Sequence, residues 1–218
     1  MQVAEELIKY SKLVYQKGFL AATDGNLSAR LPNGNILITG SSVCKGEIVE
    51  SDLVETDLDG NIITGNRKPS TESKLHYHIY KNRSDVNAVI HTHPVFALVC
   101  ASSNISMDKP YFPEVILSIG RIPTCKYATP STDALHRSLD PFIDYASVFL
   151  LQNHGAVATG RSIKEAFYRT DKLEHTARVI LEATKSGGIK PLLRYQIDEL
   201  YAIAGKSYGI SLHQKNRY

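Results

Sequence analysis

The apolar run Ala88–His93 ends in two histidines and is stopped by Pro94, and it constrains the fold more than any other segment. A short apolar run bounded in this way predicts a buried strand. Side chains at i and i+2 of a strand point to one face, so His91 and His93 are expected to project together at an edge of the sheet. Two imidazoles placed in this way can chelate zinc, although a pair of surface histidines would have the same spacing.

Hairpin and helix patterns alternate around this strand. Turn residues at 32–34 and 59–60 predict two hairpins. Their strands, and two further buried strands, are expected at 26–29, 36–39, 53–57, 62–64, 147–152 and 156–159. Helical periods or capping signals are found at 3–17, 70–82, 94–101, 162–186 and 198–206. This mixture predicts an α/β protein in which helices cover a largely antiparallel or mixed sheet.

Length and composition predict a single domain over residues 1–218. The chain has 218 residues, 43% of them hydrophobic, and no linker rich in proline, glycine or serine divides it. The 25 basic and 22 acidic side chains leave a net charge of +3 without a dense basic stripe, which argues against a nucleic-acid partner. No apolar run approaches the roughly 20 residues that span a bilayer, so no membrane partner is expected.

The three cysteines indicate the compartment. Cys44, Cys100 and Cys125 are odd in number and widely spaced, so they form neither a disulfide framework nor a CxxC metal pair. The N-terminal residues carry charges and lack the apolar core of a signal peptide. We therefore expect free thiols in a cytoplasmic protein.

A third metal ligand is expected at His154. The apolar run before it predicts a buried strand that ends in Asn153-His154-Gly155, and Gly155 permits a sharp turn that a side chain would forbid. Three histidines with one open position are typical of a catalytic zinc site and not of a closed structural one. By itself His154 is equally consistent with an ordinary loop histidine.

Glu72 lies in the first turn of the helix expected after Pro69, with Ser70 as the candidate N-cap. A carboxylate there could approach the metal and move a proton, but the helix dipole alone also favours glutamate at this position. His76 and His78 are interpreted as helix-face or core residues and not as ligands. The remaining histidines are interpreted as surface or helix residues: His136, His175 and His213.

Two polar turns are suited to binding an oxyanion, one at 23–28 and one at 39–42. Successive backbone N–H groups in such turns form anion nests, and the free N–H groups near Ser70 and Thr71 at a helix start add to them. Polar turns of this kind are common, so each is a weak indication by itself. Lys45, near the second turn, could add a cation to this site, but a solvated lysine is the favoured interpretation.

Taken in order, the motifs at 23–28, 38–42, 69–72, 91–93 and 154–155 resemble those of the class II aldolase and adducin family, which includes the L-fuculose-1-phosphate aldolases. The resemblance covers nearly the whole chain. It implies an α/β fold whose mostly antiparallel central sheet of about nine strands is covered by helices on both sides. It also implies a homotetramer with active sites at the subunit interfaces.

The resemblance further implies a zinc-dependent aldolase that reversibly cleaves a ketose 1-phosphate to dihydroxyacetone phosphate and an aldehyde. The family's metal ligands match His91, His93, His154 and Glu72, and Glu72 also matches its catalytic glutamate. The family's phosphate-binding positions match Asn26, Ser41, Ser42, Ser70 and Thr71. A tail tyrosine supplied by the neighbouring subunit matches Tyr208, within a C-terminal tail that is expected to be mobile from about residue 205.

The sequence departs from the family pattern at two places. Ser41-Ser42 stands where the family has Thr-Gly, and a second active-site tyrosine falls at Tyr111 or Phe112, with Phe112 favoured by an ungapped alignment. Other activities of the family stay open. Methylthioribulose-1-phosphate dehydratases and sugar-acid phosphate decarboxylases retain a glutamate at the position of Glu72, whereas pentulose-phosphate 4-epimerases typically carry aspartate. Adducin heads, the non-enzymatic alternative, lack the metal residues that this chain retains.

Overall fold

The structure is a computed structural model that describes residues 2–103, 105–208 and 212–218. Its first half consists of two helices and two hairpins. In chain order these elements are α1 (Gln2–Gln16), β1 (Asn26–Arg30), β2 (Ile36–Thr39), a 3-10 turn (Glu50–Asp52), β3 (Leu53–Thr56), β4 (Ile62–Thr64) and α2 (Ser73–Asn82). The turns of the two hairpins lie at 32–34 and 59–60, the two glycine-containing segments where turns were predicted.

The second half contains the longest helix and the remaining strands. These elements are β5 (Ala88–Thr92), α3 (Val95–Ser102), α4 (Pro113–Ser118), β6 (Thr124–Cys125), α5 (Asp133–Arg137), β7 (Val148–Leu151), β8 (Gly155–Gly160), α6 (Ile163–Lys185) and α7 (Arg194–Ile203). A π-helical turn (Ala204–Tyr208) and a 3-10 turn (Gln214–Asn216) follow. Within the described ranges, none of the helices has both the length and the apolar character that crossing a lipid bilayer requires.

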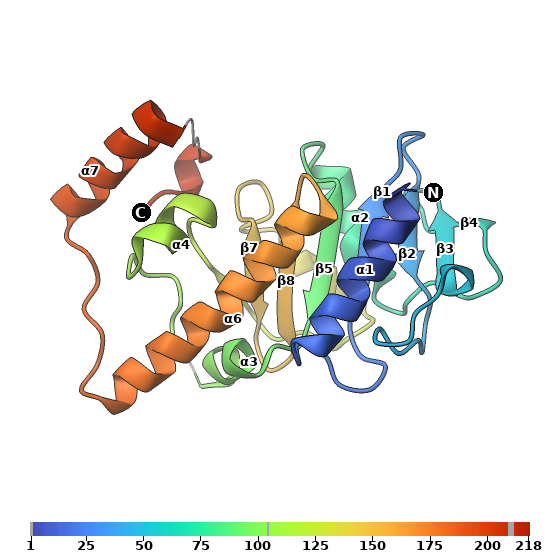
Figure 1. Ribbon diagram of the computed structural model, residues 1–218, viewed down its shortest axis with the longest axis horizontal. Helices are drawn as coiled ribbons and strands as arrows, with labels where there is room; N and C mark the ends of the chain where they lie inside the picture. Colours follow the sequence, from blue (N-terminus) through green and yellow to red (C-terminus); the bar gives the residue numbers. More distant parts are fainter. Residues whose placement is uncertain (1, 104, 209–211) are drawn as a thin grey trace.

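Eight strands form one mixed sheet in the described part of the chain, in the order β4-β3-β2-β1-β5-β8-β7-β6 (Figure 1). Neighbouring strands pair antiparallel except β6 and β7, which run parallel. The expected sheet of about nine mostly antiparallel strands is therefore corrected to a mixed sheet of eight. Strand β6 is only two residues long, so its sequence carries no recognisable strand period.

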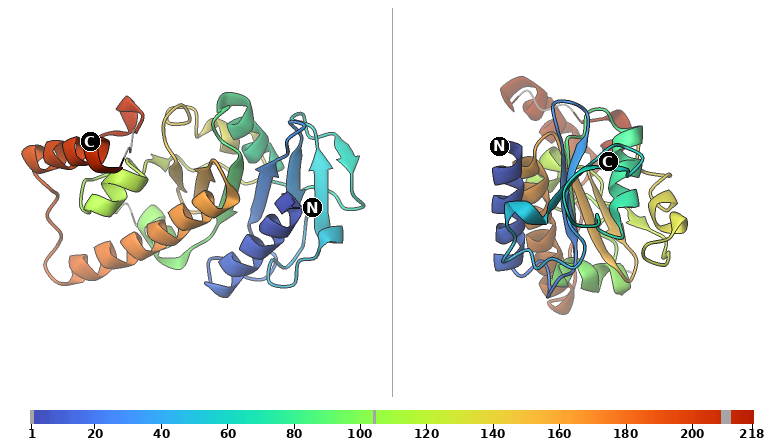
Figure 2. Two further views of the ribbon diagram at one scale, coloured as in Figure 1. Left: turned by 45° about the horizontal axis from the view of Figure 1, so that its top comes forward. Right: turned by 90° about the vertical axis from the view of Figure 1, so that its right-hand side faces the viewer.

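Alternate residues of the central strands enter cores on opposite faces of the sheet. Ala88 and Ile90 of β5 pack with α1 and the start of α6. Val89 of β5 and Val157 of β8 pack on the other face, under α2 and α5. The helices thus form a layer on each side of the sheet, as the side view in Figure 2 shows for α1 and α2. Because side chains alternate, His91 projects on the α2 side with Val89.

Helix α2 begins at Ser73 and not at Ser70, which was the expected N-cap. The Oγ of Ser70 accepts a hydrogen bond from Nδ2 of Asn26 over 2.9 Å, and it lies 3.4 Å from the backbone N of Glu72. Ser70 is therefore engaged by β1, and Glu72 occupies the N-cap position of α2. This arrangement brings the start of α2 to the end of the sheet at which β5 stops.

The C-terminal residues fold back onto the turn that follows α4. Asn216 is buried, its Nδ2 donates to the carbonyl oxygen of Ile119 over 2.8 Å, and its Oδ1 accepts from the backbone N of Arg121 over 2.9 Å. A Cβ at Gly120 would lie 2.5 Å from the carbonyl oxygen of Asn216. The close approach at Gly120 therefore permits this docking.

Candidate metal and sugar-phosphate site

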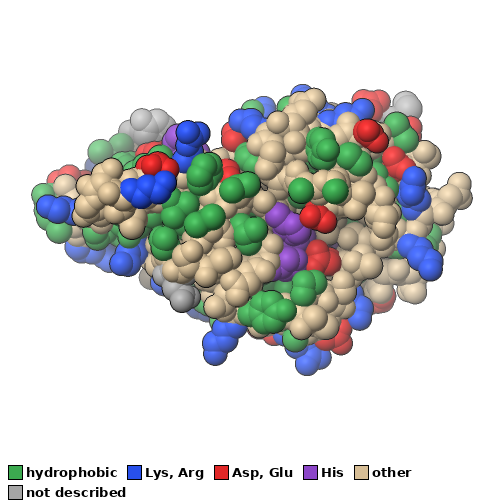
Figure 3. Space-filling model, turned by 90° about the horizontal axis from the view of Figure 1, so that it is seen from below, with side chains coloured by type: hydrophobic (Ala, Val, Ile, Leu, Met, Phe, Trp, Pro, Cys, Tyr) green, Lys and Arg blue, Asp and Glu red, His purple; other side chains and the backbone are tan. Residues whose placement is uncertain are grey.

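The histidines singled out from the sequence meet at the end of the sheet where β5 stops. His91 and His93 come from β5 and the residue just beyond it, His154 from the turn between β7 and β8, and Glu72 from the start of α2. One ring nitrogen of each histidine lies within 4.8 Å of the other two. Seen from below, histidine side chains lie together near the centre of the face shown in Figure 3, with acidic side chains beside them. Four side chains from three separate segments thus form one cluster.

Ring nitrogens and carboxylate oxygens face one another in this cluster. Nε2 of His91 lies 3.2 Å from Nε2 of His93 and 3.1 Å from Oε2 of Glu72. Nε2 of His154 lies 3.2 Å from Oε1 of Glu72. The His91 side chain is fully buried, whereas 23% of the His93 side chain is exposed, so the cluster opens to the surface beside His93.

The backbone of β8 sets the tautomer of His91. Nδ1 of His91 lies 3.0 Å from the carbonyl oxygen of Ala156. A carbonyl oxygen can only accept, so Nδ1 carries the proton and donates it. The lone pair of the neutral ring is then on Nε2, which faces Glu72 and His93. A backbone acceptor of this kind is the usual orienting partner of a metal-binding histidine.

Close backbone approach fixes the position of His154. A Cβ at Gly155 would lie 2.5 Å from the carbonyl oxygen of Thr92 and 2.6 Å from Cδ2 of His93. Position 155 therefore requires glycine for space. The left-handed conformation of this turn falls instead at Asn153, with φ 54°. Asparagine tolerates that conformation better than most residues.

Burial and neighbouring charges act on the ionisable groups of the cluster. Burial opposes ionisation of Glu72, but the imidazoles of His154 and His91 outweigh it and hold the pKa of this carboxyl well below its usual range. Burial lowers the pKa of His93 to about 3, and His91 and His154 act in the same direction. A neutral His93 and an ionised Glu72 are the forms that bind a cation.

The donor set fits a divalent cation. Oε1 of Glu72 is buried and, although Nε2 of His154 lies 3.2 Å away, the angles of that contact do not make a hydrogen bond and no other described residue donates one. A bound cation would satisfy that oxygen, and three ring nitrogens with a carboxylate are a ligand set that zinc accepts. Among the described residues, the three histidines are also the one group of His, Cys, Asp or Glu side chains found close enough together to hold a metal.

The residues expected to bind phosphate lie on adjacent segments beside this cluster. Asn26 pairs with His91 across β1 and β5, and its Nδ2 reaches Ser70. Gly40 forms a β-bridge with Pro69, and the backbone N of Ser41 donates to the carbonyl oxygen of Lys68 over 2.9 Å. The turn at 40–42 and the turn at 68–71 are therefore neighbours. Ser42, at a left-handed φ of 58°, and Thr71 are exposed on these turns.

The sequence analysis misjudged Lys45 and did not single out Asp24, two charged residues near the site. Lys45 was interpreted as solvated, but it is 2% exposed and its Nζ donates to the carbonyl oxygens of Thr23 and Val43 over 2.8 and 2.9 Å. Asp24 places Oδ2 at 3.7 Å from Nδ1 of His93. The position of Asp24 in the same turn as Asn26 was the available signal, whereas a lone lysine in a loop gives none.

The tyrosine positions receive less support. The side chain of Tyr208 is outside the described part of the structure, so its assignment stays a prediction. Tyr111 and Phe112 are half-buried and pack against the core formed by α3, α4 and α6, with their ring centroids 6.2 Å apart.

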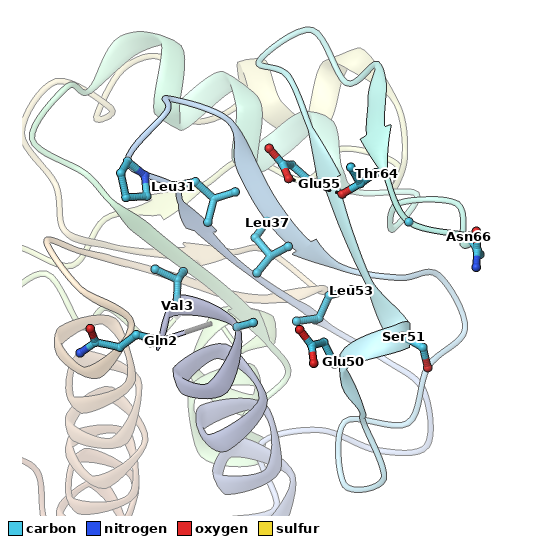
Figure 4. Close-up of a pocket in the computed structure, with 13 residues that line it drawn as sticks. Gln2, Val3, Leu31, Leu37, Glu50, Ser51, Leu53, Glu55, Thr64 and Asn66 are labelled. Atoms are coloured by element: carbon cyan, nitrogen blue, oxygen red, sulfur yellow. Dashed lines mark hydrogen bonds between the residues drawn. The ribbon is translucent and has the colours of Figure 1, made fainter.

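Two hollows lie away from the histidine cluster. One, of about 580 Å³, lies between the start of α1 and strands β2 and β3, with Leu37 and Glu55 in its wall (Figure 4). Its carboxylate at Glu55 already accepts from Nδ2 of Asn35 over 2.6 Å. The other, of about 1140 Å³, lies beside the start of α6, and its Arg83 donates to both carboxylate oxygens of Asp85. The charged groups named in each hollow are thus engaged within the protein.

Comparisons with known proteins point to one family. The family model of the class II aldolase and adducin N-terminal domain matches residues 5–181. A 3-oxo-tetronate 4-phosphate decarboxylase of Pectobacterium atrosepticum is 34% identical over 80% of this chain and 82% of its own. A 5-deoxy-D-ribulose 1-phosphate aldolase of Bacillus thuringiensis is 34% identical over 94% of this chain and 95% of its own. The solved structure of an L-fuculose 1-phosphate aldolase has a TM-score of 0.84 and 30% identity, covering 94% of this chain and 96% of that one.

Proposed function

Because this chain belongs to the class II aldolase and adducin N-terminal domain family, we propose that it is a zinc-dependent aldolase that cleaves a ketose 1-phosphate. The products are dihydroxyacetone phosphate and an aldehyde. One observation carries the proposal: three imidazoles and the Glu72 carboxylate converge beside Asn26 and Ser70. The Bacillus thuringiensis aldolase, similar along 94% of this chain, supports it.

His91, His93 and His154 would hold the cation, with Glu72 as a further ligand when no substrate is present. A divalent cation at this position supplies Lewis acidity, which polarises a substrate carbonyl and stabilises the negative charge that develops on its oxygen. The Nδ1–H of His91 stays bonded to Ala156, so its Nε2 remains directed into the site.

The substrate's phosphate would be bound by Asn26, Ser41, Ser42, Ser70 and Thr71. Asn26 offers an amide at the start of β1, and the other four residues offer hydroxyl and backbone N–H donors on two adjacent turns. Phosphate oxygens accept such hydrogen bonds, and successive N–H groups in turns favour anions. Binding the phosphate here orients the carbonyl end of the sugar toward the histidine cluster.

Glu72 would move the proton that the cleavage requires. Breaking the bond between C3 and C4 leaves the electron pair on an enediolate. Once the substrate displaces Glu72 from the cation and from the histidines, burial would raise the pKa of this carboxyl, and its protonated form would give a proton to C3 to form dihydroxyacetone phosphate. In the reverse direction the Glu72 carboxylate removes that proton. Tyr208 of a neighbouring subunit would accept the proton of the C4 hydroxyl during cleavage, and would return it to the aldehyde oxygen in the reverse direction.

Decarboxylation is the second candidate, favoured by the similarity to the Pectobacterium decarboxylase. Loss of carbon dioxide from a 3-oxo-tetronate 4-phosphate breaks the bond between C1 and C2 and leaves the same enediolate. Protonation at that carbon by Glu72 again yields dihydroxyacetone phosphate. The two candidates therefore share every proposed residue role except that of Tyr208 and differ in the leaving fragment.

The proposal includes a homotetramer with active sites at subunit interfaces. In support, apolar side chains are exposed at the end of the sheet that carries the site: Val95 and Val99 follow His93 on α3, and Tyr127 follows β6. Their exposed fractions are 57%, 40% and 55%. Burying such groups is a favourable contribution to association. Light scattering coupled to size exclusion tests this directly, and a monomer at micromolar concentration would contradict it.

A substrate panel tests the activity. Metal-loaded protein is incubated with ketose 1-phosphates and with a 3-oxo-tetronate 4-phosphate, and dihydroxyacetone phosphate is measured by a coupled reductase assay. We expect this product from at least one ketose 1-phosphate, together with an aldehyde. Product from the oxo acid alone, with release of carbon dioxide, would replace the first candidate by the second. No product from either class would contradict both.

A further inference from the structure

A chain of buried polar groups lies behind the proposed phosphate pocket, on the α2 face of the sheet. His76 is completely buried, with Nε2 at 2.5 Å from Oδ1 of Asn26 and Nδ1 at 2.6 Å from Oγ of Ser28. Oγ of Ser28 lies 2.8 Å from the hydroxyl of Tyr80. Each of these four residues is at most 2% exposed, so solvent does not complete their hydrogen bonds.

The hydroxyl of Tyr80 sets the direction of this chain. Within the described residues, Oγ of Ser28 is the one atom placed to accept a proton from the Tyr80 hydroxyl. A buried hydroxyl that donates to nothing is unfavourable, so Tyr80 donates to Ser28. Ser28 must then donate its own proton to Nδ1 of His76. Burial lowers the pKa of His76 to about 3, so its ring is neutral and the ring proton is on Nε2.

The direction continues to the surface of the pocket. Nε2–H of His76 donates to Oδ1 of Asn26, which turns the Nδ2 of that amide toward Oγ of Ser70 at 2.9 Å. The backbone N–H of Glu72 approaches the same oxygen at 3.4 Å. Because two donors are aimed at Oγ, the Ser70 hydroxyl keeps its own proton for a group in the pocket. Within the described residues the Asn26 amide donates to Ser70 alone, so its second N–H can also serve that group.

We propose that His76 is a positioning residue that presets Asn26 and Ser70 as hydrogen-bond donors toward a phosphate group of the substrate. This inference rests on the proposed function, from which it takes the phosphate pocket. Phosphate oxygens accept hydrogen bonds, and a pocket whose amide and hydroxyl are already donors binds them without reorientation. This chain of buried polar groups therefore favours substrates that carry a phosphate group.

Two substitutions at position 76 separate this role from a purely structural one. In His76→Gln, the side-chain N–H reaches the position of Nε2 and still donates to Asn26. In His76→Asn, the shorter amide reaches only the position of Nδ1, so Oδ1 of Asn26 loses its donor and the Asn26 amide can turn over. Both variants remove the ring, but His76→Gln keeps the bond to Asn26 and gives up the one from Ser28, whereas His76→Asn does the reverse.

Calorimetric titration of the metal-loaded protein with inorganic phosphate provides the test. We expect His76→Asn to raise the Kd about tenfold or more and His76→Gln to stay within about threefold of the wild type. Both variants should keep the wild-type metal content. The KM for the sugar phosphate should follow the phosphate Kd, with a smaller change in kcat. An unchanged Kd in His76→Asn, or equal losses in both variants, would overturn the inference.

Two further variants complete the test. If His76→Asn does not fold, Ser28→Ala takes its place. It removes the hydroxyl that donates to Nδ1, and we expect a Kd at least about threefold higher, whereas an unchanged Kd overturns the inference. Ser70→Ala separates this inference from the proposed function. If phosphate binding weakens in Ser70→Ala but not in His76→Asn, the positioning role of His76 is refuted and the phosphate pocket stands. If the wild type binds no phosphate, the pocket is refuted as well.

Discussion

His91 donates from Nδ1 to the carbonyl oxygen of Ala156 over 3.0 Å, across the pairing of β5 with β8. The ladder that holds the sheet together therefore also fixes which nitrogen of His91 is free. That nitrogen, Nε2, faces Glu72 and His93, so the geometry of the site is a consequence of strand register. A slip of one residue between β5 and β8 would turn His91 to the opposite face of the sheet.

Substitution of Glu72 separates proton transfer from metal binding. Glu72→Gln keeps the size of the side chain and removes the group that gains and loses a proton. We expect kcat to fall by roughly 10²–10⁴-fold, the usual contribution of a positioned acid or base, while the protein retains its metal. Steady-state rates and metal analysis of the same preparation measure both quantities. A variant with the wild-type kcat would remove Glu72 from the chemistry.

A methyl group at Gly155 should disturb the site through the backbone. In Gly155→Ala, the added Cβ would lie 2.5 Å from the carbonyl oxygen of Thr92, so the turn that carries His154 must shift. We expect metal affinity to fall together with the melting temperature. Gly205→Ala is the matched control, because its Cβ meets no atom within 4 Å. Equal metal affinity in the two variants would contradict the close approach at Gly155.

Stability should depend on pH through His76. Its pKa is lowered from 6.5 to about 3 by burial, so below pH 6.5 the unfolded chain binds a proton that the folded chain excludes. The free energy of unfolding should therefore decrease as pH falls from 6.5 toward 3, by about 1.4 kcal/mol per pH unit for this group. Urea unfolding of metal-free protein at pH 6.0 and 5.0 measures the slope.

The variant His76→Gln is the control for that slope. It lacks the titrating ring, so its free energy of unfolding should vary less with pH by about the same 1.4 kcal/mol per unit. His93, whose pKa is also lowered to about 3, contributes equally to both proteins and cancels in the comparison. Identical slopes in the variant and the wild type would refute a buried, neutral His76.

Local patterns were sufficient for much of this fold. The apolar run before His91 predicted both ends of β5 to within one residue, and the glycine-containing turns predicted both N-terminal hairpins. The family resemblance inferred from the motifs is confirmed by the family model that matches residues 5–181. These features are encoded within a few neighbouring residues, which is why sequence periodicity detects them.

Features that depend on distant contacts were not predictable from local patterns. Helix α2 starts at Ser73 because Asn26, 44 positions away from Ser70, engages the expected cap. Lys45 is buried because two backbone carbonyls happen to converge on its Nζ. The two-residue strand β6 owes its existence to pairing with β7. In each case at least one decisive partner is remote in sequence, as Thr23 is for Lys45, so propensity and spacing contain no record of it.

Metal content tests the central claim most directly. Purified wild-type protein, dialysed against zinc and then against metal-free buffer, is compared with His154→Ala and with His175→Ala by elemental analysis. His175 is exposed on α6 and controls for non-specific histidine binding. We predict close to one zinc per chain in the wild type and in His175→Ala, and far less in His154→Ala. Equal zinc in all three proteins, or none in the wild type, would contradict the account.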